Sequence, residues 1–94
     1  MKRAWAEIER LISARSIHRK GFCITDADPH FIIGQAIDEF SELIESPDDP
    51  VEMADLLGIL FHYCIKQGWT ADALEALMLE KFAVRFSDVK EVAR

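Results

Sequence analysis

The sequence has no long apolar run and few cysteines, and both absences limit what the protein can be. Because no stretch of about 18 apolar residues occurs, we expect no membrane-spanning segment. The N-terminal residues lead into alternating charges rather than an apolar stretch, so we also expect no secretory signal. Cys23 and Cys64 are too few for a disulfide framework or a four-cysteine zinc site. We therefore expect a reducing, cytoplasmic location.

Basic residues are also scarce. The chain has 11 lysines and arginines against 17 acidic residues, which gives a formal net charge of −6. This charge disfavours binding to nucleic acid backbones and to anionic membranes, so we expect neither as a partner. A chain of 94 residues has room for one modest core, and we expect a single domain over residues 1–94.

Glycine and proline are rare, and they divide the chain into segments of helical character. The apolar residues of the long segments recur with helical spacing, and few runs alternate as a strand does. Asp28-Pro29 and Asp49-Pro50 are typical helix starts, and Thr70 can cap a further helix. We therefore predict an all-α protein that resembles a four-helix bundle. The predicted helices cover about residues 2–18, 29–45, 50–67 and 71–86.

The second and third predicted helices carry two pairs of carboxylates. Glu39 and Glu42 are three residues apart on one helix, and Glu52 and Asp55 are three apart on the next. Such residues lie on nearly the same face of a helix, and a short connecting turn makes the two helices antiparallel neighbours. The two pairs can then face each other. Four converging carboxylates repel one another, and a hard cation such as Mg²⁺ or Mn²⁺ relieves that repulsion.

Acidic helix faces are also common without a metal, and simpler explanations exist for these residues. Glu45 and Asp48 extend the acidic stripe, as on an ordinary solvated surface. Glu52 stands three residues after Asp49, a capping-box position where the helix dipole favours a carboxylate. The helical wheel nevertheless favours the metal. It places Glu52 inside the apolar arc of its helix, where a carboxylate without a partner is costly.

The fourth predicted helix carries two basic residues within its apolar stripe. Lys81 and Arg85 are four residues apart and project to the same side of the helix. Their stems can snorkel along the apolar surface, or their charges can complement the C-terminus of the helix. Beside a group of four carboxylates, however, two inward-facing cations indicate phosphate binding.

Three linked motifs resemble a known family. In chain order they are Asp38-Glu39-x-x-Glu42, Glu52-x-x-Asp55 and Glu80-Lys81-x-x-x-Arg85. This series resembles the all-α nucleoside triphosphate pyrophosphohydrolases of the MazG-like superfamily, relatives of dimeric dUTPases and phosphoribosyl-ATP pyrophosphohydrolases. The match covers about residues 30–89. The chain departs from the family pattern at Asp38, where a glutamate is usual, and in a shorter gap between Glu42 and Glu52.

The resemblance implies a MazG-type fold and an enzyme that hydrolyses a nucleoside triphosphate to the monophosphate and pyrophosphate with Mg²⁺. The implied metal ligands are Glu39, Glu42, Glu52 and Asp55. Lys81 and Arg85 would bind the phosphates, and either Glu42 or Asp38 would position or deprotonate the attacking water. Candidates for the base pocket, each more typical of a core or surface position, are Trp5, His18, Phe22 and His30.

The sequence also allows a comparison with other functions of helical proteins that bind metal or partners. A di-iron carboxylate bundle requires Glu-x-x-His motifs, and no glutamate here has a histidine three residues later. His62 is expected at a helix surface or an interface rather than as a ligand. A non-catalytic helical interaction module of the same fold and a phosphoribosyl-ATP pyrophosphohydrolase-like enzyme remain as alternatives.

The third predicted helix also indicates self-association. Its apolar residues extend over roughly 240° of the helical wheel, which is more than three further helices of a small chain can cover. We therefore expect a homodimer or a homotetramer. The resemblance points in the same direction, because it implies dimers or pairs of dimers whose sites lie near the subunit boundary.

Overall fold

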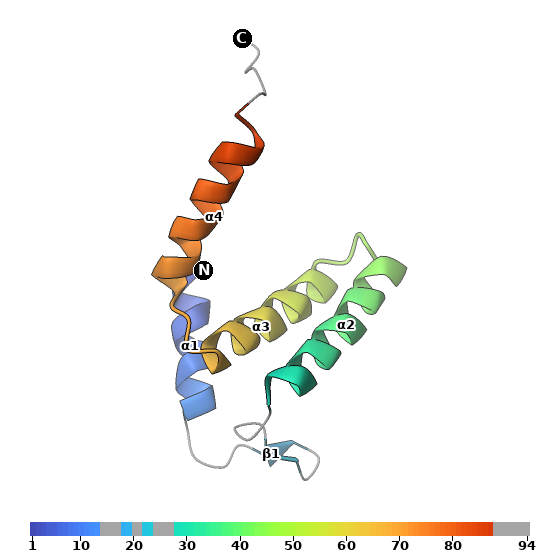
Figure 1. The fold of residues 1–94 in the computed structure, drawn as a ribbon. Coiled ribbons are helices and arrows are strands. Elements are labelled where there is room, and N and C mark those ends of the chain that lie inside the picture. Colours follow the sequence, from blue (N-terminus) through green and yellow to red (C-terminus); the bar gives the residue numbers. More distant parts are fainter. Residues whose placement is uncertain (14–17, 20–21, 24–27, 88–94) are drawn as a thin grey trace.

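The structure is a computed structural model that describes residues 1–13, 18–19, 22–23 and 28–87. Most of these residues belong to helices. The helices are α1 (Lys2–Ser13), α2 (Pro29–Glu45), α3 (Pro50–Lys66) and α4 (Ala71–Arg85), as Figure 1 shows. A short antiparallel pair, β1 (His18–Arg19) and β2 (Phe22–Cys23), lies between α1 and α2. The predicted helical class is therefore confirmed, with this small hairpin as an addition.

The end of the first predicted helix is wrong. His18 does not belong to α1 but to β1, where it pairs with Cys23, while Arg19 pairs with Phe22. Residues 14–17, which the prediction also placed in this helix, lie outside the described residues. Strands of two residues are too short to produce the alternating pattern by which a strand is recognised in a sequence.

The starts of the other three helices follow the predicted caps. The carboxylate of Asp28 accepts a hydrogen bond from the backbone N–H of Phe31 at 2.9 Å. The carboxylate of Asp49 accepts from the backbone N–H of Val51 at 3.0 Å, and the Thr70 side chain caps α4. These oxygens satisfy backbone donors that have no partner within the helix, which fixes where each helix begins.

The helices α1, α2 and α3 pack together. The antiparallel pair α2 and α3 forms a hairpin, and α1 lies across α3 (Figure 1). The ring of Trp5 on α1 stacks at a tilt on that of Phe61 on α3, with 5.2 Å between their centres. Among the described residues the buried ones are Trp5, Ile32 and His62, so the core lies between these three helices.

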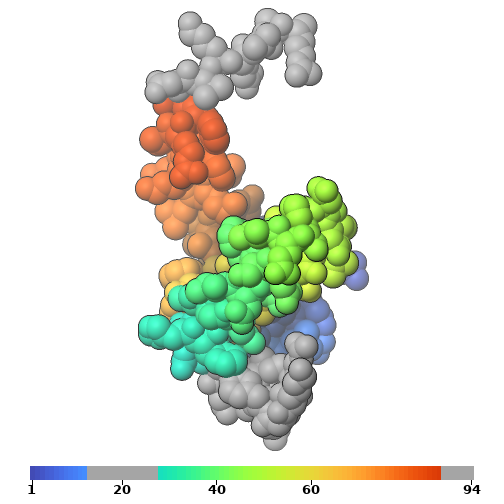
Figure 2. All heavy atoms as spheres, turned by 90° about the vertical axis from the view of Figure 1, so that its right-hand side faces the viewer, coloured from blue at the N-terminus to red at the C-terminus, as the bar shows by residue number. Residues whose placement is uncertain are grey.

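The fourth helix extends away from the others. Gly68 follows α3 with a φ of +80°, a left-handed conformation that favours glycine, and the chain then turns into α4. Figure 1 shows α4 diverging from the α2–α3 hairpin, and Figure 2 shows it standing clear of the body. None of its residues is buried. Within the described part of the chain, no helix is both long and apolar enough to cross a membrane.

Candidate metal site

The turn between α2 and α3 brings the two acidic pairs together. The backbone N–H of Ser46 donates to the carbonyl of Glu42 at 3.0 Å, which ends α2, and the N–H of Asp49 donates to the carbonyl of Ser46 at 3.1 Å. The chain thereby reverses within four residues, 46–49. The last turns of α2 consequently lie beside the first turns of α3.

The structure places the four predicted metal ligands in one cluster. Glu39, Glu42, Glu52 and Asp55 each contribute a carboxylate oxygen, and these oxygens all lie within 4.8 Å of one another. The predicted face-to-face arrangement of the two acidic pairs is therefore seen. We call these four residues the carboxylate cluster.

The cluster is partly shielded from water. Glu39 and Glu52 are half-buried, whereas Glu42 and Asp55 are exposed. One oxygen of Glu39 and one of Glu52, the Oε2 atom in each case, is buried and has no hydrogen-bond partner among the described residues. An acceptor in that position is costly unless a cation or a donor satisfies it.

The surroundings raise the pKa of both half-buried carboxyls above their usual range. For Glu39 the main cause is the partial removal of water from its carboxyl group. The next causes are a hydrogen bond with the Glu42 side chain and the negative charge of Glu42, and the charges of Asp55 and Glu52 add smaller effects. The pKa of Glu52 is raised in the same way, by loss of water first and then by Glu42, Asp49 and Asp55. Both shifts mean that the cluster resists carrying its full negative charge.

Within the described chain, no lysine or arginine forms an ion pair with the cluster. The two ion pairs found there are Lys2 with Asp72, at 3.1 Å, and Arg10 with Glu7. The negative charge of the cluster is therefore left without an ion-paired cation from the described residues. An all-oxygen set of four carboxylates, two with unsatisfied oxygens, fits a hard divalent cation such as Mg²⁺ or Mn²⁺.

The other predicted site residues lie outside the cluster. Asp38 is an exposed residue of α2 and does not belong to the converging set. Lys81 and Arg85 are exposed on α4, which points away from the α2–α3 hairpin (Figure 1). Arg85 instead lies over the ring of Phe82, 5.6 Å from its centre. Within one chain the structure does not bring these cations to the carboxylates.

The candidates for a base pocket are not gathered together. Trp5 is a core residue that stacks on Phe61, and His30 is exposed at the start of α2. His18 and Phe22 lie in β1 and β2, and the environment of their side chains falls outside the described part of the structure. Of the four candidates, the two whose side chains are described, Trp5 and His30, therefore do not form a pocket at the cluster.

His62 differs from its prediction. It was expected at a surface or an interface, but only 8% of it is exposed, and its Nε2 atom has no hydrogen-bond partner among the described residues. Its pKa is lowered, first by burial and then by the charge of Lys66. A signal was available in the sequence, because Asp55, Ile59 and His62 follow the spacing of one helix face, which is the face turned to α2.

Comparisons of the chain with models of protein families, with curated proteins and with solved structures found no match. The resemblance to the MazG-like superfamily therefore rests on the three sequence motifs alone.

Proposed function

We propose that the protein is a Mg²⁺-dependent pyrophosphohydrolase that converts a nucleoside triphosphate to its monophosphate and pyrophosphate. The observation that carries this proposal is the convergence of four carboxylates from two helices within 4.8 Å, without an ion-paired cation from the described chain. A MazG-type fold, a cytoplasmic location and assembly into a homodimer or homotetramer belong to the same proposal.

The ligands of the metal in this proposal are Glu39, Glu42, Glu52 and Asp55. When bound, Mg²⁺ supplies positive charge that offsets the charge developing on the phosphate oxygens during hydrolysis. Glu39 and Glu52 have the buried oxygens that lack a partner, so they are the residues whose environment changes most when the metal binds. The exposed carboxylates, Glu42 and Asp55, face the solvent from which a substrate arrives.

A carboxylate must also position or deprotonate the attacking water. Glu42 and Asp38 were both predicted for this role, and Glu42 is favoured because its oxygen belongs to the cluster, whereas Asp38 stands apart from it. Such a group must lie within hydrogen-bond reach of the water that it activates. Replacement of Glu42 by Gln should therefore lower the turnover number more than replacement of Asp38 by Asn.

Lys81 and Arg85 are the proposed phosphate-binding residues. Both residues are on the exposed helix α4, so their contact with a substrate at the cluster requires another subunit or another placement of that helix. If they bind phosphate, Lys81→Ala and Arg85→Ala should lower activity by more than they lower the melting temperature. Normal hydrolysis by both variants would remove them from the site.

A panel of nucleoside triphosphates tests the proposal directly. The purified protein is incubated with each nucleotide and millimolar Mg²⁺, and released pyrophosphate is measured. We expect release for at least one nucleotide, its loss in EDTA, and its loss in Glu52→Gln with helix content unchanged. Glu45→Gln is the matched control, because Glu45 is an exposed acid of the same helix hairpin outside the cluster.

The same variants separate an enzyme from a non-catalytic helical module. If Mg²⁺ raises the melting temperature of the wild-type protein but not that of Glu52→Gln, the cluster binds metal. If no nucleotide is then hydrolysed, the protein is the non-catalytic module. If Mg²⁺ and Mn²⁺ at millimolar concentration produce no thermal shift at all, the metal site itself is wrong.

A further inference from the structure

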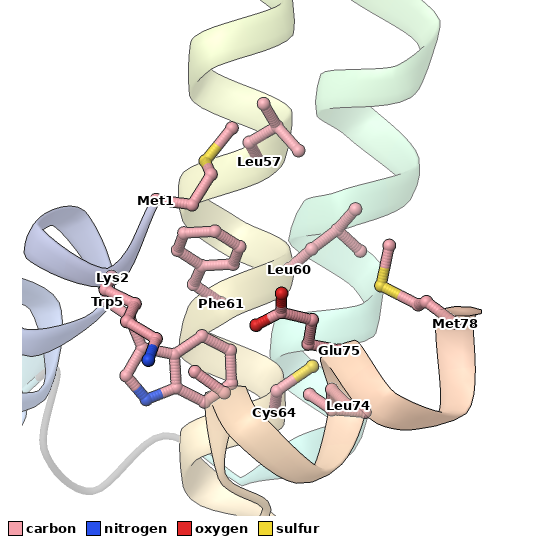
Figure 3. A pocket seen from close by; sticks show the side chains of 11 residues that line it. Met1, Lys2, Trp5, Leu57, Leu60, Phe61, Cys64, Leu74, Glu75 and Met78 are labelled. Carbon is pink, nitrogen blue, oxygen red and sulfur yellow. The ribbon is translucent and has the colours of Figure 1, made fainter. Parts of the chain in front are cut away.

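A second part of the molecule, away from the carboxylate cluster, has the features of a binding groove. The space between α1, α3 and α4 holds a cavity of about 660 Å³ that opens to solvent. Its walls are mainly apolar and include Trp5, Leu57, Leu60 and Phe61 (Figure 3). We call this space the α3–α4 groove.

One carboxylate interrupts the apolar wall of the groove. Figure 3 shows the side chain of Glu75 projecting among the apolar side chains. The neighbouring cation, Lys2, forms its ion pair with Asp72 at 3.1 Å, and its charge also attracts Glu75 over a longer distance. Among the described residues, no cation forms a close ion pair with Glu75 itself. An occupant of this groove is therefore expected to carry an apolar group and a positive charge close together.

The far end of α4 carries that combination. Phe82 and Arg85 lie on the side of the helix that lines the groove, but beyond the cavity, and the guanidinium of Arg85 sits over the ring of Phe82. Both residues are exposed. The exposure of the large apolar residues from Leu77 to Phe86 ranges from 46% to 71%. The C-terminal half of α4 thus lacks cover while the N-terminal half borders an open groove.

The spacing along α4 fits the two halves to each other. Ala71, Glu75, Met78, Phe82 and Arg85 are separated alternately by four and three residues, which is the spacing of a helix–helix seam. In an antiparallel pair of α4 helices, Met78 of one copy meets Phe82 of the other, and Glu75 meets Arg85. The midpoint of 78 and 82 and the midpoint of 75 and 85 are both position 80. One register of the two helices therefore forms the Met78–Phe82 and the Glu75–Arg85 contacts together.

We propose that the α3–α4 groove is filled by α4 of a second copy of this chain, in a two-fold antiparallel pair. Phe82 of each copy enters the groove of the other beside Met78, and Arg85 of each copy pairs with Glu75 of the other. The contact is isologous, so the N-terminal half of each α4 covers the C-terminal half of the other, and the Glu75–Arg85 pair forms twice. Such a pair covers the exposed apolar residues on this side of α4, Met78 and Phe82, and leaves the carboxylate cluster free.

Another exposed stripe is a weaker candidate for self-association. Ile33, Ile37, Phe40 and Ile44 follow a similar spacing on α2 and are exposed. No lysine or arginine occurs on α2, so that stripe has no charge pair that would select an occupant or fix a register. The charge pattern of α4 therefore decides between the two faces.

A charge exchange on the full chain tests the proposal. Sedimentation equilibrium at micromolar concentration should give a dimer of the 10.7 kDa chain. Glu75→Arg and Arg85→Glu should each raise the dissociation constant at least about tenfold, since each places like charges opposite one another. The double variant, with both changes, should recover the dimer. Circular dichroism should show unchanged helix content in all three variants.

Glu80→Arg is the matched control, because Glu80 is exposed on the opposite side of α4 and undergoes the same charge change as Glu75. It should leave the dissociation constant unchanged. A wild-type monomer would overturn the proposal and leave the groove to another ligand. A wild-type dimer that Glu75→Arg does not weaken would also overturn it, and would point to the α2 stripe.

The readout is mass, so the outcome does not depend on the proposed enzymatic activity. The experiment also separates two roles of Arg85. If Arg85 only joins the subunits, the double variant should regain both the dimer and any hydrolytic activity. If it binds phosphate, the double variant should not regain activity.

Discussion

Glu39 and Glu52 each bury a carboxylate oxygen that has no partner among the described residues. The charged form of each carboxylate is therefore less favourable in the folded protein than in the unfolded chain. The raised pKa values of both groups express the same effect. These two residues make the carboxylate cluster different from an ordinary acidic surface. A solvated acid would keep its usual pKa, because water would stabilise its charge.

The first prediction concerns pH in the absence of metal. Because the pKa of Glu39 is higher in the folded state than its usual 4.5, its stability contribution is complete below that value and is lost as the pH rises through the folded pKa. In EDTA, Glu39→Gln should melt at nearly the wild-type temperature at pH 4 and at a higher temperature at pH 8. Differential scanning fluorimetry across this range measures the difference. Addition of Mg²⁺ at pH 8 should reverse the order.

Glu45→Gln is the control for this measurement, because it removes an exposed acid from the same hairpin. A difference between Glu39→Gln and wild type that stays constant with pH would contradict the account of the cluster.

His62 provides a second prediction, with the opposite sign. Burial lowers its pKa below 6.5, so the folded state favours the neutral imidazole. The contribution of neutral His62 to stability is therefore complete above pH 6.5, and it is lost as the pH falls toward the lowered pKa. The melting temperature of His62→Phe relative to wild type should therefore rise as the pH is lowered from 8 to 5.5. His30→Gln, at an exposed position, should show no such trend. A parallel pH dependence in wild type and His62→Phe would rule out this role.

At the scale of elements, the helix starts are the part of the fold that the sequence determines most directly. Thr70 caps α4 by accepting a hydrogen bond from the N–H of Ala73 at 3.2 Å. Thr70→Ala should lower the free energy of unfolding by about 1 kcal/mol, which is the usual cost of a lost cap. Urea denaturation measures this change. Thr70→Ser keeps the hydroxyl oxygen and should lose much less; an equal loss in both variants would mean that the cap contributes little.

The helix starts and the carboxylate cluster were predictable because they depend on local sequence signals. Asp28-Pro29 and Asp49-Pro50 are local signals, and the carboxylate cluster follows from two helical spacings and one short turn. The β1–β2 hairpin was missed because its strands are too short to produce a pattern. The position of α4 was missed for another reason. The direction of a helix after a turn is set by packing, and the apolar stripe of α4 has little to pack against among the described residues.

At the scale of the whole molecule, the amount of exposed apolar surface decides how stability should behave. Among the described residues only Trp5, Ile32 and His62 are buried, while large apolar residues of α2 and α4 remain exposed. A single chain with so small a core is expected to be marginally stable. Covering these surfaces in an oligomer would therefore supply a large part of the folding free energy.

The whole-molecule prediction is that unfolding depends on protein concentration. If dissociation and unfolding are coupled, the melting temperature should fall by several degrees when the protein is diluted about 100-fold. Calorimetry or fluorimetry at a series of concentrations checks this. Glu75→Arg should melt at a lower temperature than wild type and lose the concentration dependence. A melting temperature that is the same at all concentrations would indicate a monomer that is stable alone.

All four carboxylates of the cluster come from one short stretch of chain, residues 39–55. Their approach requires the α2–α3 hairpin alone, and contacts so close in sequence form early when a chain folds. A cation at the cluster would then join the two helices before α1 has docked on α3. Its effect on kinetics should appear as faster refolding rather than slower unfolding, because the interactions that it strengthens are already present at the folding barrier. The acidic hairpin would in that case be the nucleus from which the rest of the chain is ordered.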